Sequence, residues 1–214
     1  MKNRLLILAL GTLMGLISVG CSLFGKGSEE QPSYEVVLKQ DDKEIRKYDR
    51  YIIAKTTING SFKEAQSKGF RILAGYIFGK NKSQKKIAMP VPILQKPESE
   101  KISMTAPVVI APNENKSWTM TFNMPSKFTT ETLPVTTDQR VKIEKVEPRF
   151  VAAIRFSGTW DESRNAEESK KLMEWIKSYQ EYELISKPMF AGYNPPWTLP
   201  FLRRNEMLIE LRRK

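Results

Sequence analysis

The sequence predicts an α+β fold in which two similar halves join into one distorted antiparallel β-barrel with two flanking α-helices. Strand-like runs dominate the chain, and two segments with helical periodicity interrupt them. The halves also resemble each other: Arg50-Tyr-Ile-Ile-Ala and Arg149-Phe-Val-Ala-Ala each precede a helical segment, and Asn59–Phe62 matches Ser157–Trp160. A repeat spaced by about one hundred residues indicates two pseudo-symmetric strand-strand-helix-strand-strand units.

The expected strands are short runs rich in β-branched and aromatic residues. Asp41-Asp42 marks a turn between the first two, and Pro148 lies between a later pair. The runs are Tyr34–Leu38, Glu44–Tyr48, Tyr51–Ile58, Lys86–Leu94, Lys101–Ile110, Ser117–Met124, Val141–Val146, Arg149–Phe156, Met189–Tyr193 and Glu206–Leu211.

Two segments carry apolar residues three or four positions apart, the spacing of an amphipathic helix. The first begins at Phe62 after Ser61, a suitable N-cap, and ends at Gly79. The second begins near Asp161 and extends to Tyr179. We expect both helices to pack their apolar sides on the sheet.

A shorter repeat lies between the helices, where Lys86–Pro92 and Lys101–Val108 share the pattern Lys-Ile-x-Met. Pro90, Pro92 and Pro107 have no N–H to donate to a central strand. These segments are therefore expected at a sheet edge or as extended arms that pack Met and Val into the core.

The N-terminus has the pattern of a secretory signal. Lys2 and Arg4 precede an uncharged run of about 15 residues, which is short for a membrane-spanning helix. The run closes at Ser18-Val19-Gly20-Cys21, which resembles the lipobox of bacterial lipoproteins. This resemblance implies cleavage before Cys21 and acylation of its thiol. We expect a signal peptide at 1–20, a flexible tether at 21–33 and one domain at 34–214.

Composition narrows the chemistry of that domain. The 214 residues include no histidine and a single cysteine, Cys21, so zinc hydrolases, imidazole bases and cysteine nucleophiles are excluded. We therefore expect no catalytic residues, no metal site and no enzymatic activity. Removing residues 1–20 takes away two basic residues and no acidic ones, which lowers the net charge from +11 to +9. In an exported protein this charge favours an anionic lipid or small ligand over nucleic acid.

Four ordered motifs carry a resemblance that spans about Tyr34 to Leu211. They are Ser103-Met-Thr-Ala-Pro-Val108 after Gly79–Lys82, Phe122-Asn-Met-Pro125, Tyr193-Asn-Pro-Pro196 and Arg203-Arg-Asn-Glu206. Together they resemble the SOUL haem-binding family. The resemblance implies the duplicated barrel described above, of the type shared with GyrI-like effector-binding domains. It also implies that haem or another tetrapyrrole binds in a shallow hydrophobic cleft beside the first helix, bordered by the loop Asn194–Leu202.

The candidate ligand residues follow from the needs of a flat apolar ring with two carboxylates, which are aromatic walls and cations at the rim. Because the chain lacks histidine, any axial ligand would be Met, Tyr or Lys. The candidates are Lys63, Lys68 and Arg71 for the propionates, Tyr76 on the same helix, and Trp197, Leu199 and Phe201 in the loop.

Two other functions remain open at this stage. One is a structural or interaction lipoprotein of the cell envelope that has no small-molecule ligand. The other is a GyrI-like cleft for other small organic molecules, often cationic, which predicts a carboxylate among aromatics, with Glu64 or Glu174 as candidates. Arg203-Arg-Asn-Glu206 is expected to fix the last strand by hydrogen bonds and ion pairs.

The expected location is the cell envelope, facing the periplasm. Ser22 rather than aspartate follows Cys21, which implies the outer membrane if the organism is Gram-negative.

Overall fold

A computed structural model describes residues 29–84, 99–159, 161–195 and 197–214. The predicted signal peptide, Cys21 and the expected strand Lys86–Leu94 lie outside the described residues. Residues 30–33, at the end of the predicted tether, are bound to the domain: Glu30 O accepts from Ala106 N at 3.0 Å, and Ser33 O accepts from Asp49 N at 3.1 Å. No helix in the described part of the chain is long and apolar enough to cross a membrane.

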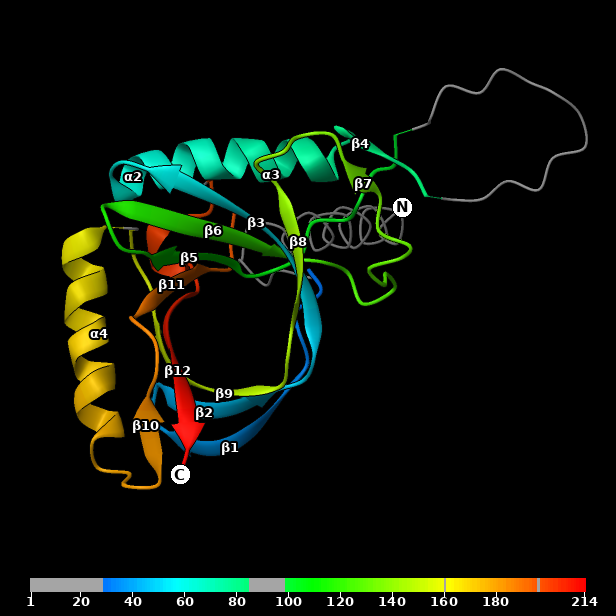
Figure 1. The fold of residues 1–214 in the computed structure, drawn as a ribbon. Coiled ribbons are helices and arrows are strands. Elements are labelled where there is room, and N and C mark those ends of the chain that lie inside the picture. Colours follow the sequence, from blue (N-terminus) through cyan, green and yellow to red (C-terminus); the bar gives the residue numbers. More distant parts are fainter. Residues whose placement is uncertain (1–28, 85–98, 160, 196) are drawn as a thin grey trace, which may run out of the picture.

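The predicted fold class is confirmed: one mostly antiparallel sheet curls into a half-barrel, with helices on its outer side (Figure 1). The sheet order is β1-β2-β9-β12-β11-β5-β6-β3-β8, with β10 also paired to β12, so β1 and β8 form its two edges. The strands are β1 (Tyr34–Gln40), β2 (Lys43–Tyr48), β3 (Tyr51–Asn59), β5 (Val108–Pro112), β6 (Ser117–Asn123), β8 (Lys142–Val146), β9 (Arg149–Phe156), β10 (Tyr182–Leu184), β11 (Met189–Gly192) and β12 (Asn205–Arg213). A separate small ladder joins β4 (Asn81–Lys82) to β7 (Val135–Thr136).

The two halves exchange strands. β2 precedes β3 in the chain but pairs with β9 of the second half, and β8 precedes β9 but pairs with β3 of the first half. β5 and β11 meet in the middle of the sheet, with Phe190 opposite Ile110. Each half therefore supplies a strand that pairs with a strand of the other half. The sequence similarity of the halves did not show this exchange.

Alternation along the strands separates a convex face from a concave one. On β12, Met207, Ile209 and Leu211 belong to the main core, whereas Leu208 belongs to a second, smaller core. On β9, Ala152 and Ala153 divide in the same way. The main core lies between the sheet and the helices, and the second lies within the curl of the sheet.

The first helical segment runs through three parts, α2 (Phe62–Glu64), the π-helical η1 (Ala65–Gly69) and α3 (Phe70–Ile77). Phe62, Leu73 and Ile77 are buried on its inner side. The second helix, α4 (Glu162–Ile176), packs Leu172 and Ile176 against the same core. Figure 1 shows the two helices on the outside of the curl, at different parts of the sheet.

One expected strand is shorter than predicted. The run Lys101–Ile110 becomes a strand only from Val108, and the residues before it form an extended arm. Ile102 N donates to Ile77 O at 2.8 Å at the end of α3, and Thr105 Oγ1 donates to Asn123 O. The arm therefore bonds to the helix end and to β6 in place of a strand ladder, as the proline at 107 indicated.

Candidate functional site

The first helix begins with a reciprocal cap. Glu64 N donates to Ser61 Oγ, and Ser61 N donates to Glu64 Oε2 at 3.0 Å. Lys68 Nζ lies 2.8 Å from Glu64 Oε1, one helical turn further on. The hydrogen bond from Lys68, together with that from Ser61, lowers the pKa of Glu64 to about 2. The Glu64 carboxylate is thus bonded to the Ser61 backbone and to Lys68, and it lies on the surface rather than in a cleft.

The π-helical turn η1 follows directly and carries Lys68. At its end, Gly69 lies against Met120 of β6, so closely that an added Cβ would be 3.1 Å from Met120 Cβ. Turns of this kind are rare and are frequently found at functional sites. Here the turn lies between the cap and a group of basic residues on the outer side of the helix.

These basic residues surround a small surface cleft, which we call the cationic cleft. Its lining consists of Ile58, Lys68, Arg71, Ile72, Lys80, Asp138 and Arg140, around a volume of about 250 Å³. Asp138 is bound by Arg140, whose hydrogen bonds lower the pKa of Asp138 to about 2. Among the described residues, Arg71 and Lys80 take part in no ion pair. These two cations therefore lie, without an ion pair to any described residue, at an opening whose walls include Ile58 and Ile72, and the charge of Lys80 also helps to lower the pKa of Asp138.

The other predicted ligand residues lie elsewhere. Lys63 is exposed on the first turn of the helix. Tyr76 is 1% exposed, and its hydroxyl donates to Pro134 O at 2.8 Å, so it packs in the core rather than on the ligand face. The loop with Trp197, Leu199 and Phe201 bonds through Pro200 O to Gly158 N, just before α4. None of its residues lines the cationic cleft.

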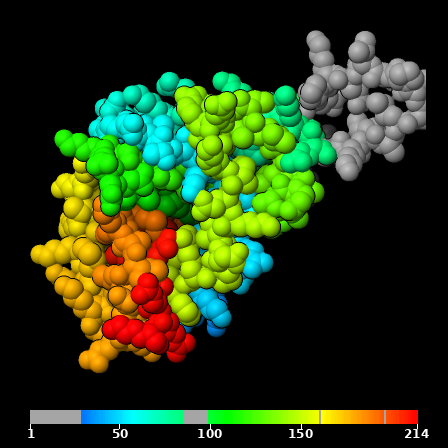
Figure 2. Space-filling view, viewed as in Figure 1, coloured from blue at the N-terminus to red at the C-terminus, as the bar shows by residue number. Residues whose placement is uncertain are grey.

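A larger hollow lies inside the curl of the sheet, and we call it the central cleft. It has a volume of about 520 Å³. It is lined by residues of β3, β5, β6 and β8 and by residues of β9, β11 and β12. In the space-filling view, side chains fill much of the opening between the ribbons of Figure 1, and the differently coloured strands of the two halves meet around it (Figure 2).

The carboxylates of the central cleft already have basic partners. Glu210 pairs with Arg149, Glu144 with Lys55, and Glu147 with Arg50 at 2.7 Å. Arg149 also donates to Tyr51 Oη at 2.7 Å. The two acidic residues expected in such a cleft are not in it, because Glu64 caps the first helix and Glu174 is exposed on α4. Sequence reasoning missed the actual set, since Glu210 on β12 is more than sixty residues from Glu144 and Glu147, and their basic partners Lys55 and Arg50 are also distant in the chain.

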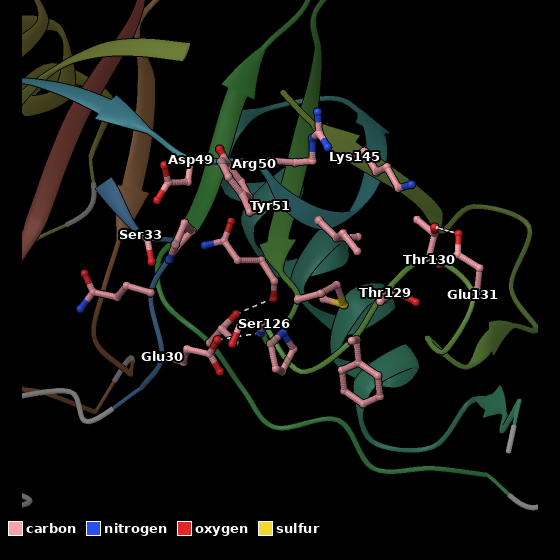
Figure 3. A pocket seen from close by; sticks show the side chains of 18 residues that line it. Glu30, Ser33, Asp49, Arg50, Tyr51, Ser126, Thr129, Thr130, Glu131 and Lys145 are labelled. Carbon is pink, nitrogen blue, oxygen red and sulfur yellow. Dashed lines mark hydrogen bonds between the residues drawn. The ribbon is translucent and has the colours of Figure 1, made fainter. Parts of the chain in front are cut away.

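A further pocket of about 780 Å³ adjoins the central cleft and shares Pro32, Tyr51, Asn123 and Lys145 with it. Figure 3 shows Glu30 and Ser126 on one side of this pocket and Arg50 and Lys145 on the opposite side. Ser126 N donates to Glu30 Oε1 at 2.6 Å. The segment that leads to the N-terminus therefore forms part of the wall at this end of the cleft.

The motif Arg203-Arg-Asn-Glu206 holds a buried charge network, which confirms its predicted structural role. Glu206 is fully buried and receives hydrogen bonds from Arg46 (2.7 and 3.0 Å), Arg204 (2.7 Å) and the Tyr193 hydroxyl (2.6 Å). Burial acts to raise the pKa of Glu206, but the bonds and charges of Arg46 and Arg204 outweigh it and lower that pKa. Burial also raises the pKa of Tyr193 well above its ordinary value.

The residues of the described chain form no cluster of three or more His, Cys, Asp or Glu side chains able to hold a metal ion. Within the part of the chain that the structure describes, two sites are able to hold a ligand. The cationic cleft at the first helix is lined by basic and apolar residues, and the central cleft contains both acidic and basic residues.

Comparison with known proteins identifies the family. The family model described as SOUL heme-binding protein matches residues 29–210, which is most of the chain. The chain belongs to the SOUL haem-binding family. No curated protein matches it.

Solved structures with the same fold are distant in sequence. The C-terminal domain of EcmrR has a TM-score of 0.56 at 11% identity and covers 85% of this chain and 99% of its own. EcmrR in a DNA complex has a TM-score of 0.55 at 13% identity, covering 100% of this chain and 71% of its own. A protein from Listeria innocua described as a hydrolase has a TM-score of 0.52 at 11% identity, with coverages of 82% and 94%. These similarities establish a GyrI-like effector-binding fold and no more.

Proposed function

We propose that this protein is a lipid-anchored binding protein of the cell envelope that holds haem or a related tetrapyrrole, and that it is not an enzyme. Membership of the SOUL haem-binding family supports the ligand class. The signal-like N-terminus and Cys21 support export and acylation, with the domain facing the periplasm and, in a Gram-negative organism, the outer membrane. Its partners are then the membrane and the ligand, and nucleic acid is not among them.

The observation that carries the proposal is the presence of Arg71 and Lys80, which form no ion pair with the described residues, at the cationic cleft beside Ile58 and Ile72. Guanidinium and ammonium groups form charge-assisted hydrogen bonds with carboxylates such as propionates. At about 250 Å³ the cleft is smaller than pockets that enclose whole ligands, about 300 Å³ or more. The macrocycle would therefore lie across the opening, with its propionates on the cations. A bound haem would supply its iron chemistry, and the chain would supply only position and charge.

A titration of purified residues 22–214 with haemin tests this. We expect saturation near one equivalent that persists in moderate salt, because burial of the ring does not depend on ionic strength. The double variant Arg71→Gln and Lys80→Gln should weaken binding about tenfold, since it removes both charge-assisted bonds. Lys170→Gln on α4 with Lys177→Gln at its C-terminal cap is the matched control and should bind as the wild type does.

The same titration separates this site from the central cleft. Thr121 faces that cleft from β6, so Thr121→Trp would fill it. Haemin binding that survives Thr121→Trp and is lost in the helix-one variant supports the proposal. Binding lost in Thr121→Trp alone assigns the ligand to the central cleft. A flat titration favours a lipoprotein without a small-molecule ligand.

A further inference from the structure

Three large apolar side chains project from one short loop. Trp197 is 82% exposed, Phe201 is 70% exposed and Leu199 is 53% exposed. Single exposed apolar residues are ordinary on protein surfaces, but several together mark a contact surface. Trp197 is also the most exposed large hydrophobic residue in the described chain.

The loop is held in this exposed form by backbone bonds. Leu202 N donates to Leu199 O at 2.9 Å within the short 3₁₀ turn η2 (Pro200–Leu202). Gly158 N donates to Pro200 O at 2.9 Å, and Arg203 Nε donates to Thr198 O at 2.8 Å. The main chain is thus fixed on both sides of Leu199, and the apolar side chains are presented outward on a fixed support.

The loop is followed by Arg204, which lies in space beside the segment where the N-terminus meets the domain. Arg204, two residues after η2, reaches Gln31 Oε1 at 3.4 Å through its guanidinium. From Glu29, where the described chain begins, Cys21 is eight residues away, a reach of at most about 28 Å when extended. An anchor at Cys21 would therefore keep this side of the domain within a short distance of the bilayer.

We propose that Trp197, Leu199 and Phe201 form a membrane-contacting loop that inserts into the interfacial layer of the bilayer. This rests on the export and anchoring proposed above. Trp favours the membrane interface because its ring is apolar and its N–H is polar, and Leu and Phe supply buried apolar area. The net charge of +9 after removal of residues 1–20 adds attraction to anionic lipid. The loop and the anchor together would orient the domain on the membrane.

Vesicle binding by unacylated residues 22–214 tests the loop without the anchor. These residues contain the whole family match, 29–210, and both hydrophobic cores. The vesicles contain phosphatidylcholine and phosphatidylglycerol, either plain or brominated on the acyl chains. We expect sedimentation with vesicles and quenching of tryptophan fluorescence by the brominated chains. Trp197→Phe should remove the quenching and leave sedimentation nearly unchanged, because phenylalanine keeps the apolar contact.

The variant Trp197→Ala, Leu199→Ala and Phe201→Ala should lower the vesicle partition coefficient about tenfold or more. Phe78→Ala, which removes an exposed aromatic of 60% exposure at the end of α3, is the matched control and should not change it. Circular dichroism checks that both variants are folded.

Equal partition of the triple variant and the wild type would overturn the proposal, as would absence of bromolipid quenching. So would a concentration-dependent dimer that the triple variant abolishes, because the loop would then bind a second copy. Haemin binding is measured without vesicles, so failure of the ligand proposal leaves the vesicle result intact. Failure of acylation at Cys21 also leaves it intact, since the tested chain carries no lipid.

Discussion

At the scale of single residues, the strongest constraint is the buried carboxylate of Glu206. It lies between two arginines from distant parts of the chain, Arg46 on β2 and Arg204 just before β12. The guanidinium of Arg204 also lies over the Tyr193 ring, 3.8 Å from its centroid. Removing one partner from a buried ion pair leaves the other charge desolvated and uncompensated.

We therefore expect Glu206→Gln to lower the free energy of unfolding by about 3 to 5 kcal/mol, because Arg204 loses its carboxylate and the buried Arg46 keeps only its pair with Glu44. Urea denaturation followed by circular dichroism measures this. Glu183→Gln breaks an exposed pair with Arg212 and is the control, with an expected change of about 0.5 kcal/mol or less.

Glu206→Gln should also remove a pH-dependent contribution to the free energy of unfolding. The folded-state pKa of Glu206 is lowered from its ordinary value of 4.5, so its stabilisation is present above that value and is lost as the pH falls through the lowered pKa. The wild type should lose stability in this acid range more steeply than Glu206→Gln. Parallel slopes for the two proteins would contradict this role of Glu206.

At the scale of elements, the two halves begin their helices differently. Gly60 and Gly158 occupy matching positions and have positive φ angles of 124° and 122°. A Cβ added at Gly60 would collide with the Glu64 carboxylate of the capping box, whereas one at Gly158 meets nothing within 4 Å. The two glycines thus share a backbone requirement but differ in their surroundings.

Gly158→Ala should cost about 1 to 3 kcal/mol from backbone strain alone. Gly60→Ala should cost about 1 kcal/mol more, because it also displaces the reciprocal cap between Ser61 and Glu64. Thermal unfolding of the two variants side by side measures the difference. Equal losses in the two variants would show that the cap adds nothing to the stability of this helix.

At the scale of the whole molecule, strand exchange makes the halves depend on each other. β2 is paired to β9 and β8 to β3, so separating the halves would break both ladders as well as the central pairing of β5 with β11. Neither half keeps a complete sheet on its own. We expect the domain to unfold as one cooperative unit.

Urea unfolding of two variants, each retaining tryptophan only at Trp118 in the first half or at Trp175 in the second, tests this. The other tryptophans are replaced by phenylalanine. We expect the two fluorescence transitions to coincide with each other and with the loss of far-ultraviolet circular dichroism. Separate midpoints for the two probes would show that the halves unfold independently.

The sequence predicted much of this architecture because its signals are local. The β-branched and aromatic residues of Tyr51–Ile58 and Arg149–Phe156, the Ser61 cap and the helical spacing from Phe62 are all signals from residues close together in the chain. The structure contains the strands and helix that they indicate. The boundary at Val108 was missed because the bonds of Ile102 and Thr105 go to distant segments.

The cationic cleft was predictable only where its residues are close together in the chain. Lys68 and Arg71 fall on one helix, and their spacing places them on one surface. Lys80 and Arg140 join them only through the end of α3 and the segment after β7, so the sequence did not single them out. Tyr76 shares the helix but lies on its buried side.

By itself, the sequence determined the fold class, the duplication, the lipobox-like N-terminus and the absence of histidine, because composition and short-range periodicity are enough for each. Only the tertiary structure decided which strands are exchanged, that Arg46 neutralises Glu206, and that the loop at Trp197 lies apart from the cationic cleft. These are contacts between segments up to 160 positions apart, and the curl of the sheet, rather than any local pattern, brings such segments together.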